Sequence, residues 1–92
     1  MKEKLGRISE FLKSNQLDEA RQLIAELLQE DASNEELYFF LGQIYYKKQE
    51  WGSAINAFNK VLEINPKHTD AQSQIDMTNS ILGYFTPDMF NP

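Results

Sequence analysis

His68 is the side chain of this sequence best suited to proton transfer near neutral pH, and it is the only histidine. As a general base or a metal ligand it has no recognisable set of partners. It follows Pro66 closely, so it is expected to be a solvated turn residue. The four glycines occur singly and form no phosphate-binding loop, and without cysteine there is no thiolate metal site, cysteine nucleophile or disulfide. The sequence therefore predicts that the protein is not an enzyme and needs no cofactor, metal or catalytic residue.

Acidic side chains gather between residues 18 and 36, where Arg21 is the one basic residue. Their carboxylates could dock a basic partner or a divalent cation, or they could form a solvated helix face with favourable charges at helix N-termini. The solvated face is preferred, because neither EF-hand spacing nor an Asp-x-Asp pattern supports a cation site. The residues concerned are Asp18, Glu19, Glu26, Glu30, Asp31, Glu35 and Glu36.

The balance of charge argues against two classes of partner. Fourteen acidic and nine basic side chains give a net charge of −5, which repels phosphate backbones and anionic lipid. No apolar run approaches the roughly 20 residues of a membrane-spanning helix, and no secretory signal follows Met1. We therefore expect a soluble, cytoplasmic protein that binds neither nucleic acid nor membrane.

The elements that position these side chains follow from an internal repeat. The 92 residues suffice for one domain, and sliding the chain by 34 residues pairs six positions of the same apolar character. Four of these positions in each copy recur at i, i+4, i+7 and i+8, which is the spacing of one helix face. The pairs are Phe11 with Tyr45, Leu17 with Trp51, Ala20 with Ala54, Ile24 with Phe58, Leu27 with Val61 and Leu28 with Leu62.

Residues 37–46 allow two interpretations. Their aromatic content suits two strands joined at Gly42, whereas the spacing of their apolar residues suits a helix. Ser33 and Asn34 are good N-cap residues, and Glu36 stands three residues after Ser33, as in a capping box. The helix is therefore preferred.

The boundaries of the second repeat follow from its turn residues. The first helix is predicted over residues 35–48, with a turn at residues 49–50. A second helix is predicted from Trp51 to residue 64 or 65, because Pro66 lacks an amide hydrogen and disfavours helical angles before it.

Eight residues stand at fixed offsets in the repeat that begins at residue 35: Tyr38, Leu41, Gly42, Tyr45, Ala54, Phe58, Val61 and Pro66. In type and spacing they resemble the tetratricopeptide repeat, a pair of antiparallel helices. The first repeat resembles this pattern mainly in its second helix. Arg7 and Ile8 replace the usual leucine and small residue there, and Ala32 replaces the proline.

The resemblance implies an all-α fold, in which antiparallel helix-turn-helix repeats stack as a short right-handed α-solenoid. Gly42 should let its helix lie against the partner helix beside Ala54 and Phe58. So small a core predicts marginal stability, or help from self-association. The single predicted domain, residues 1–92, consists of repeat 1 at 1–34, repeat 2 at 35–68, a capping helix at 69–83 that ends at Gly83, and a tail at 84–92.

The resemblance also implies a concave groove, lined in this family by positions 2, 5, 9, 12 and 13 of each first helix. The apolar members of the set would form a strip with a glutamine beside it, as at many binding surfaces. The alternative is that these side chains belong to the core or are covered by the tail. The groove candidates are Leu5, Ser9, Leu12, Glu36, Phe39, Gln43, Tyr46, Lys47, Ser73, Met77 and Ile81, and Lys2, Lys13, Asp70 and Ser80 complete the set.

One specialisation of the family is not expected here. Members that hold the C-terminal carboxylate of chaperones use lysine, asparagine and arginine at five clamp positions. None of the residues at the corresponding positions matches: Leu5, Ser9, Phe40, Asp70 and Gln74.

We interpret the protein as a non-enzymatic scaffold that binds a peptide or helix of another protein. The alternative is a self-assembly module, monomeric or weakly homo-oligomeric, that uses its exposed repeat ends or its tail. The tail holds four large apolar residues in nine. It should pack back on the capping helix, with Phe85 docked and residues 90–92 free, or else insert into another molecule.

Overall fold

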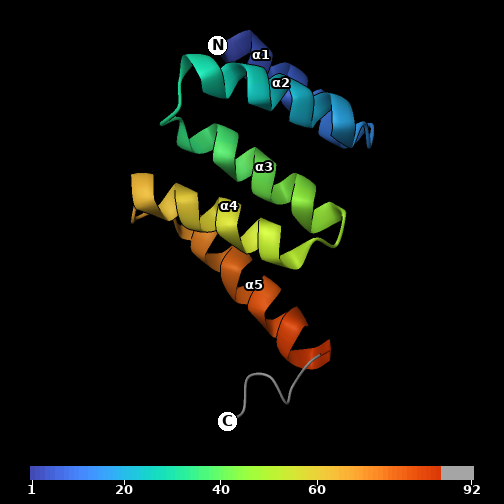
Figure 1. Cartoon of the computed structure of the whole chain (residues 1–92), viewed down its shortest axis with the longest axis vertical. Helices are drawn as coiled ribbons and strands as arrows, with labels where there is room; N and C mark the ends of the chain where they lie inside the picture. Colours follow the sequence, from blue (N-terminus) through green and yellow to red (C-terminus); the bar gives the residue numbers. More distant parts are fainter. Residues whose placement is uncertain (86–92) are drawn as a thin grey trace.

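In a computed structural model of the chain, residues 1–85 fold into five α-helices (Figure 1). The structure describes the backbone of these residues and the side chains of residues 1–83. Within these residues there is no strand. The all-α prediction is therefore confirmed, and the strand interpretation of residues 37–46 is wrong. The helices are α1 (Lys2–Lys13), α2 (Leu17–Glu30), α3 (Glu35–Lys47), α4 (Trp51–Ile64) and α5 (Thr69–Phe85).

The helices form two antiparallel hairpins followed by a single helix. In Figure 1, α1, α3 and α5 run in one general direction, and α2 and α4 run back in the other. The C-terminal ends of α1, α3 and α5 consequently lie at the same edge of the molecule, on the right of that view. This arrangement is the stacked helical-repeat solenoid that the 34-residue periodicity predicts.

The turn inside each hairpin has the same backbone structure. Asn15 and Gln49, which are 34 positions apart, both adopt left-handed angles, with φ of 58° and 61°. In the first turn the Gln16 amide donates to the Phe11 carbonyl and the Asn15 amide donates to the Leu12 carbonyl. The second turn repeats both bonds. Together they form a Schellman motif, which satisfies carbonyls left free at a helix end.

The loops between repeats end in side-chain caps, and of the two predicted caps of α3 the structure uses one. Asn34 rather than Ser33 is the N-cap of α3, and its Oδ1 accepts a hydrogen bond from the Glu36 amide at 3.0 Å. His68, the equivalent of Asn34 after 34 residues, accepts one from the Ala71 amide through Nδ1, also at 3.0 Å. The expectation of a solvated histidine is therefore wrong, since His68 is half-buried and caps α5.

The core consists of two clusters that meet at α3. The buried residues of the first cluster come from α1, α2 and α3, and those of the second from α4 and α5, with aromatic side chains of α3 packed against them. Neighbouring repeats thus share α3, as stacking repeats must when a single hairpin cannot bury both of its faces. The first cluster contains Ile8, Leu12, Ala20, Ile24, Leu27, Leu37 and Ile44, and the second contains Ala54, Phe58, Val61, Ala71 and Ile75.

The last helix is longer than expected. It continues through Gly83 to Phe85, and no glycine of residues 1–85 has a positive φ, so the predicted C-cap at Gly83 is wrong. The predictions for the tail lie outside the described residues, including the docking of the Phe85 side chain. Among the five helices, none combines the length and hydropathy needed to cross a bilayer.

Candidate binding groove

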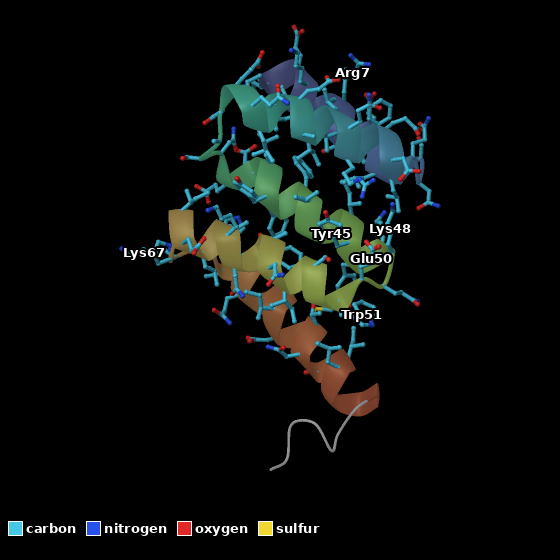
Figure 2. All side chains as sticks on the ribbon, in the orientation of Figure 1. Arg7, Tyr45, Lys48, Glu50, Trp51 and Lys67 are labelled. Atoms are coloured by element: carbon cyan, nitrogen blue, oxygen red, sulfur yellow. The ribbon has the colours of Figure 1, made fainter. Side chains whose placement is uncertain are left out.

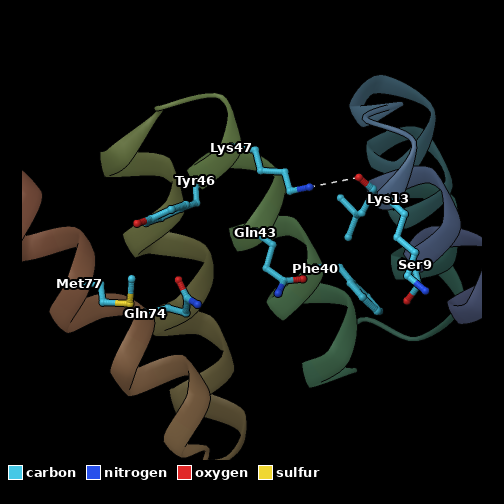
Figure 3. A pocket seen from close by; sticks show the side chains of 9 residues that line it. Ser9, Lys13, Phe40, Gln43, Tyr46, Lys47, Gln74 and Met77 are labelled. Atoms are coloured by element: carbon cyan, nitrogen blue, oxygen red, sulfur yellow. Dashed lines mark hydrogen bonds between the residues drawn. The ribbon is translucent and has the colours of Figure 1, made fainter.

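A groove of about 460 Å³ opens along the face shared by α1, α3 and α5 (Figure 3). Every residue that lines it belongs to one of these three helices, the first helix of each repeat and the capping helix. The lining residues are Ser9, Leu12 and Lys13 of α1, Phe40, Gln43, Tyr46 and Lys47 of α3, and Gln74 and Met77 of α5.

The groove is itself periodic. Its lining residues fall into sets separated by 34 positions, so successive helices present the same registers to one continuous surface. The sets are Ser9 with Gln43 and Met77, Leu12 with Tyr46, Lys13 with Lys47, and Phe40 with Gln74.

The groove brings together only part of the predicted set. Ser9, Leu12, Gln43, Tyr46, Lys47 and Met77 line it, as does Lys13. The structure does not place the other candidates in this lining. The candidates that do not line the groove are Lys2, Leu5, Glu36, Phe39, Asp70, Ser73, Ser80 and Ile81.

Phe39 is the largest of these corrections. Its ring centroid lies 5.5 Å from that of Phe58 and 5.0 Å from that of His68, so the side chain joins α3 to α4 and to the cap of α5. Leu5 likewise packs against the first core cluster. For these two residues the alternative interpretation, that they contribute to the core, describes the structure better.

Phe40 and Gln74 line the groove although they were not among its candidates. Both occupy position 6 of their helices, one residue after the expected position 5. The signal that could have found them was present, since both stand at positions that the chaperone clamp uses for ligand contact. Their residue types exclude that clamp, but not a role for the position in forming the groove.

The surface of the groove is largely apolar. Leu12 is buried beneath it, Phe40 and Tyr46 are half-buried, and Met77 is 51% exposed. Among residues 1–83, Met1 is the only other large hydrophobic side chain with comparable exposure. An exposed thioether beside aromatic rings offers a polarisable surface that adapts to the shape of a ligand.

The charge of the groove is opposite to that of the chain. Lys13 and Lys47 are the charged residues of its lining, whereas the whole chain has a net charge of −5. Lys47 Nζ donates a hydrogen bond to the Leu12 carbonyl oxygen at 3.1 Å, which links α3 to the C-terminal end of α1 (Figure 3). The two lysines thus add positive charge to an otherwise neutral and largely apolar lining.

Trp51 lies next to the groove without lining it. Its ring meets that of Tyr46 edge-on, with centroids 5.2 Å apart, at the turn near which Figure 2 labels Lys48 and Glu50. Since Trp51 is the only tryptophan, its fluorescence reports on the position of Tyr46.

The acidic residues enter no metal site in the part of the chain described. No group of three or more His, Asp or Glu side chains among residues 1–85 is placed to hold a cation. Two of the acids join elements instead. Asp18 pairs with Lys48 at 2.9 Å, and Glu35 accepts a hydrogen bond from Asn65 Nδ2 at 2.9 Å.

Comparison with known proteins identifies the family. No curated protein matches the chain. The tetratricopeptide repeat model matches residues 11–74, and it begins after Arg7 and Ile8, where the first repeat departs from the pattern. Since the match covers more than half of the sequence and the helices stack with the repeat's periodicity, the chain belongs to the tetratricopeptide repeat family.

Proposed function

We propose that the protein is a non-enzymatic scaffold that binds a peptide segment or a helix of a partner protein in the groove of α1, α3 and α5. Tetratricopeptide repeats generally mediate protein–protein interactions. The family is typically a scaffold without catalytic activity.

The observation that carries the proposal is the exposure of Met77 on the α5 side of an apolar groove (Figure 3). Every other exposed side chain of α5 between Thr69 and Gly83 is polar, so Met77 interrupts an otherwise solvated surface. It faces the same groove as Tyr46 and Phe40 on α3. Aromatic and methionine side chains in a concave surface commonly anchor a partner's apolar residues.

The groove also offers groups for the polar backbone of such a ligand. Gln43 and Gln74 project into it from α3 and α5 (Figure 3). Each amide can both donate and accept hydrogen bonds, which an extended peptide backbone requires. This arrangement suits a peptide whose apolar side chain lies between Met77 and Tyr46 and whose backbone forms hydrogen bonds with the two glutamines.

The experiment selects peptides from a random display library on the immobilised full chain and measures their affinity by the fluorescence of Trp51. Met77→Lys should weaken binding at least about tenfold, as loss of an apolar anchor at a hot spot does. Asn79→Lys is the matched control, because it places the same charge on an exposed position of α5 outside the groove. Equal affinity of the selected peptides for wild type and Met77→Lys would contradict the proposal.

The alternative is self-assembly, which rests on the small size of the core. The exposed side chains of α1 are polar or charged apart from Gly6, and those of α5 are polar apart from Met77, so the repeat ends offer little apolar surface for stacking. This observation favours the scaffold. Light scattering after size exclusion separates the two functions, since a monomer at about 0.5 mM is incompatible with useful self-assembly.

A further inference from the structure

We propose that the ligand of the groove is an acidic segment of a partner protein, in which an Asp or Glu side chain meets Lys13 and Lys47 and a nearby apolar side chain lies against Met77. The inference rests on the proposed function, because it gives the chemistry of the ligand for the same groove. It commits to a side-chain carboxylate, and not to a terminal carboxylate or a phosphate.

Charge is distributed unevenly over the groove. Lys13 on α1 and Lys47 on α3 carry the positive charge of the lining, whereas Gln74 and Met77, which α5 supplies, are neutral. Figure 3 shows the two lysines towards α1, and Gln74 and Met77 across the groove on α5. The equivalent position of α5 holds Ile81, so the repeat adds no third cation. A ligand that spans the groove therefore meets cations on α1 and α3 and an exposed thioether on α5.

The two ammonium groups are available to a ligand. Both lysines are exposed, and among residues 1–83 no carboxylate pairs with either of them. Lys48, the residue after Lys47, pairs instead with Asp18 at 2.9 Å. The hydrogen bond from Lys47 Nζ to the Leu12 carbonyl uses one of the three donors of its ammonium group. The groove thus retains positive charge that no side chain of this part of the chain neutralises.

The ends of the helices explain only part of this arrangement. Lys13 and Lys47 are the last residues of α1 and α3, where a cation interacts favourably with the helix dipole. Lysines that point away from the groove would serve that purpose equally well. In addition, no acidic side chain of residues 1–83 lines the groove, although the whole chain carries fourteen acids. A cationic surface on an acidic protein is complementary to an acidic ligand.

An acidic peptide suits this groove better than a phosphate backbone does. Binding to a phosphate backbone depends on many cations, and the groove offers two beside a largely apolar surface. A peptide supplies a carboxylate together with an apolar side chain, so it engages the lysines and Met77 at the same time. The acids elsewhere on the chain oppose such a ligand only weakly, because physiological salt screens charges beyond about 8 Å.

The test selects peptides on the immobilised full chain from two random display libraries, one that lacks Asp and Glu and one that lacks Lys and Arg. The library with Asp and Glu should be enriched for binders that carry an acid within a few residues of a large apolar side chain. Equal enrichment from the library without acids would overturn the proposal and leave the peptide site intact. Enrichment from neither library would overturn the proposed function as well.

Variants of the chain test the contact with the lysines. Lys13→Gln should weaken binding of the selected acidic peptides about twofold to fivefold. Replacing the acid of the peptide with its amide should then have a smaller effect on Lys13→Gln than on wild type. Lys67→Gln is the matched control, because it removes the same charge from an exposed turn outside the groove (Figure 2). Equal affinities for wild type, Lys13→Gln and Lys67→Gln would overturn the proposal.

Two further measurements identify the source of the negative charge. Amidation of the peptide's C-terminus should leave its affinity for the full chain unchanged, because the carboxylate that binds belongs to a side chain. A fluorescent oligothymidine should not bind at physiological salt. A loss on amidation as large as the loss on replacing the acidic side chain, or binding of the oligothymidine that Lys13→Gln weakens, would overturn the proposal.

Discussion

The ring of Phe58 fills the space that any side chain on Gly42 would need. A Cβ atom built on Gly42 would lie 2.5 Å from Phe58 Cε1, closer than real Cβ contacts come. Both residues are buried, and Phe58 has no exposed surface. The predicted close approach of α3 and α4 is thus confirmed. In the first repeat the same two positions hold Ile8 and Ile24, which are both buried. The hairpin of α1 and α2 thus has two branched side chains at these positions, whereas in the hairpin of α3 and α4 the ring of Phe58 packs against the backbone at Gly42.

Gly42→Ala should therefore destabilise the protein. The added methyl group displaces the ring of Phe58, and overpacking of this kind costs about 1 to 3 kcal/mol, against a gain of up to about 1 kcal/mol in helix propensity. A loss of melting temperature of several degrees is expected, because about 1 kcal/mol corresponds to 4 to 8 °C in a domain of this size.

Gly6→Ala is the matched control for Gly42→Ala. A Cβ atom at Gly6 would meet nothing within 4 Å, so replacing this helical glycine with alanine should stabilise the protein. Phe58→Leu should remove part of the clash when combined with Gly42→Ala, which gives the two changes a favourable coupling energy in a double-mutant cycle. Equal melting temperatures for Gly42→Ala and Gly6→Ala would contradict the tight contact.

Gln49→Gly should stabilise the protein. Gln49 holds a left-handed φ of 61° at the position of a Schellman motif that most often carries glycine. Replacement relieves a strain of about 1 to 2 kcal/mol, partly offset by the greater freedom of glycine in the unfolded chain. Urea unfolding should show a higher midpoint with an unchanged slope.

Two further variants check this explanation. Asn15→Gly should stabilise the protein less than Gln49→Gly does, because asparagine tolerates left-handed angles better than glutamine does. Gln16→Gly should lose stability, since Gln16 has a φ of −90° that needs no glycine. A gain for Gln16→Gly similar to that for Gln49→Gly would show that the left-handed angle is not the cause.

The regular part of the fold was predictable because it depends on spacing alone. Apolar residues 34 positions apart define the hairpins, and Gly42 paired with Phe58 identifies the face on which they pack. The caps were less predictable, because Ser33 and Asn34 can each cap a helix and only the loop geometry selects Asn34. His68 escaped prediction because histidine is an uncommon N-cap. Its ring also packs against that of Phe39, which belongs to a helix distant in the sequence.

The groove was predictable in its helices but not in all its positions. Adjacent positions 5 and 6 of a helix lie about 100° apart, so the rotation of α3 about its axis decides whether Phe39 or Phe40 lines the groove. The rotation of α3 depends on how Phe39 packs against Phe58 and His68, which are distant in the sequence. A family pattern transferred residue by residue cannot include that contact.

Lys48→Gln should raise the pKa of Asp18 towards its ordinary value of 3.8. The hydrogen bond and the charge of Lys48 hold the pKa of the Asp18 carboxyl below that value in the folded protein. The ion pair therefore stabilises the fold above the unfolded pKa, and its contribution is lost as the pH falls through the lower, folded value. NMR titration of the Asp18 carboxyl carbon measures the change directly.

Lys60→Gln is the control for this titration. Lys60 pairs with Glu63 at 3.5 Å, so its removal changes the net charge equally and leaves the pair of Asp18 and Lys48 intact. The pKa of Asp18 should then stay low. An equal rise in both variants would point to the net charge of the molecule and not to the ion pair.

His68→Ala should destabilise α5 through the loss of two contacts. The imidazole Nδ1 accepts from the Ala71 amide, and the ring lies 5.0 Å from that of Phe39. Removal of an N-cap costs about 0.5 to 2 kcal/mol, and an aromatic contact adds about 0.5 to 1.5 kcal/mol. The measurement is the free energy of unfolding in urea, together with hydrogen exchange at the first amides of α5.

His68→Asn separates the two contacts, because asparagine caps the preceding repeat junction at the equivalent position, Asn34. It should keep slow exchange at the Ala71 amide but lose the stability that the ring contact provides. Phe39→Leu should lower the stability of wild type more than that of His68→Asn, since the ring contact is already absent from the latter. If Phe39→Leu costs the same in both backgrounds, Phe39 and His68 are not coupled, and the orientation of α3 must be fixed by Phe58 alone.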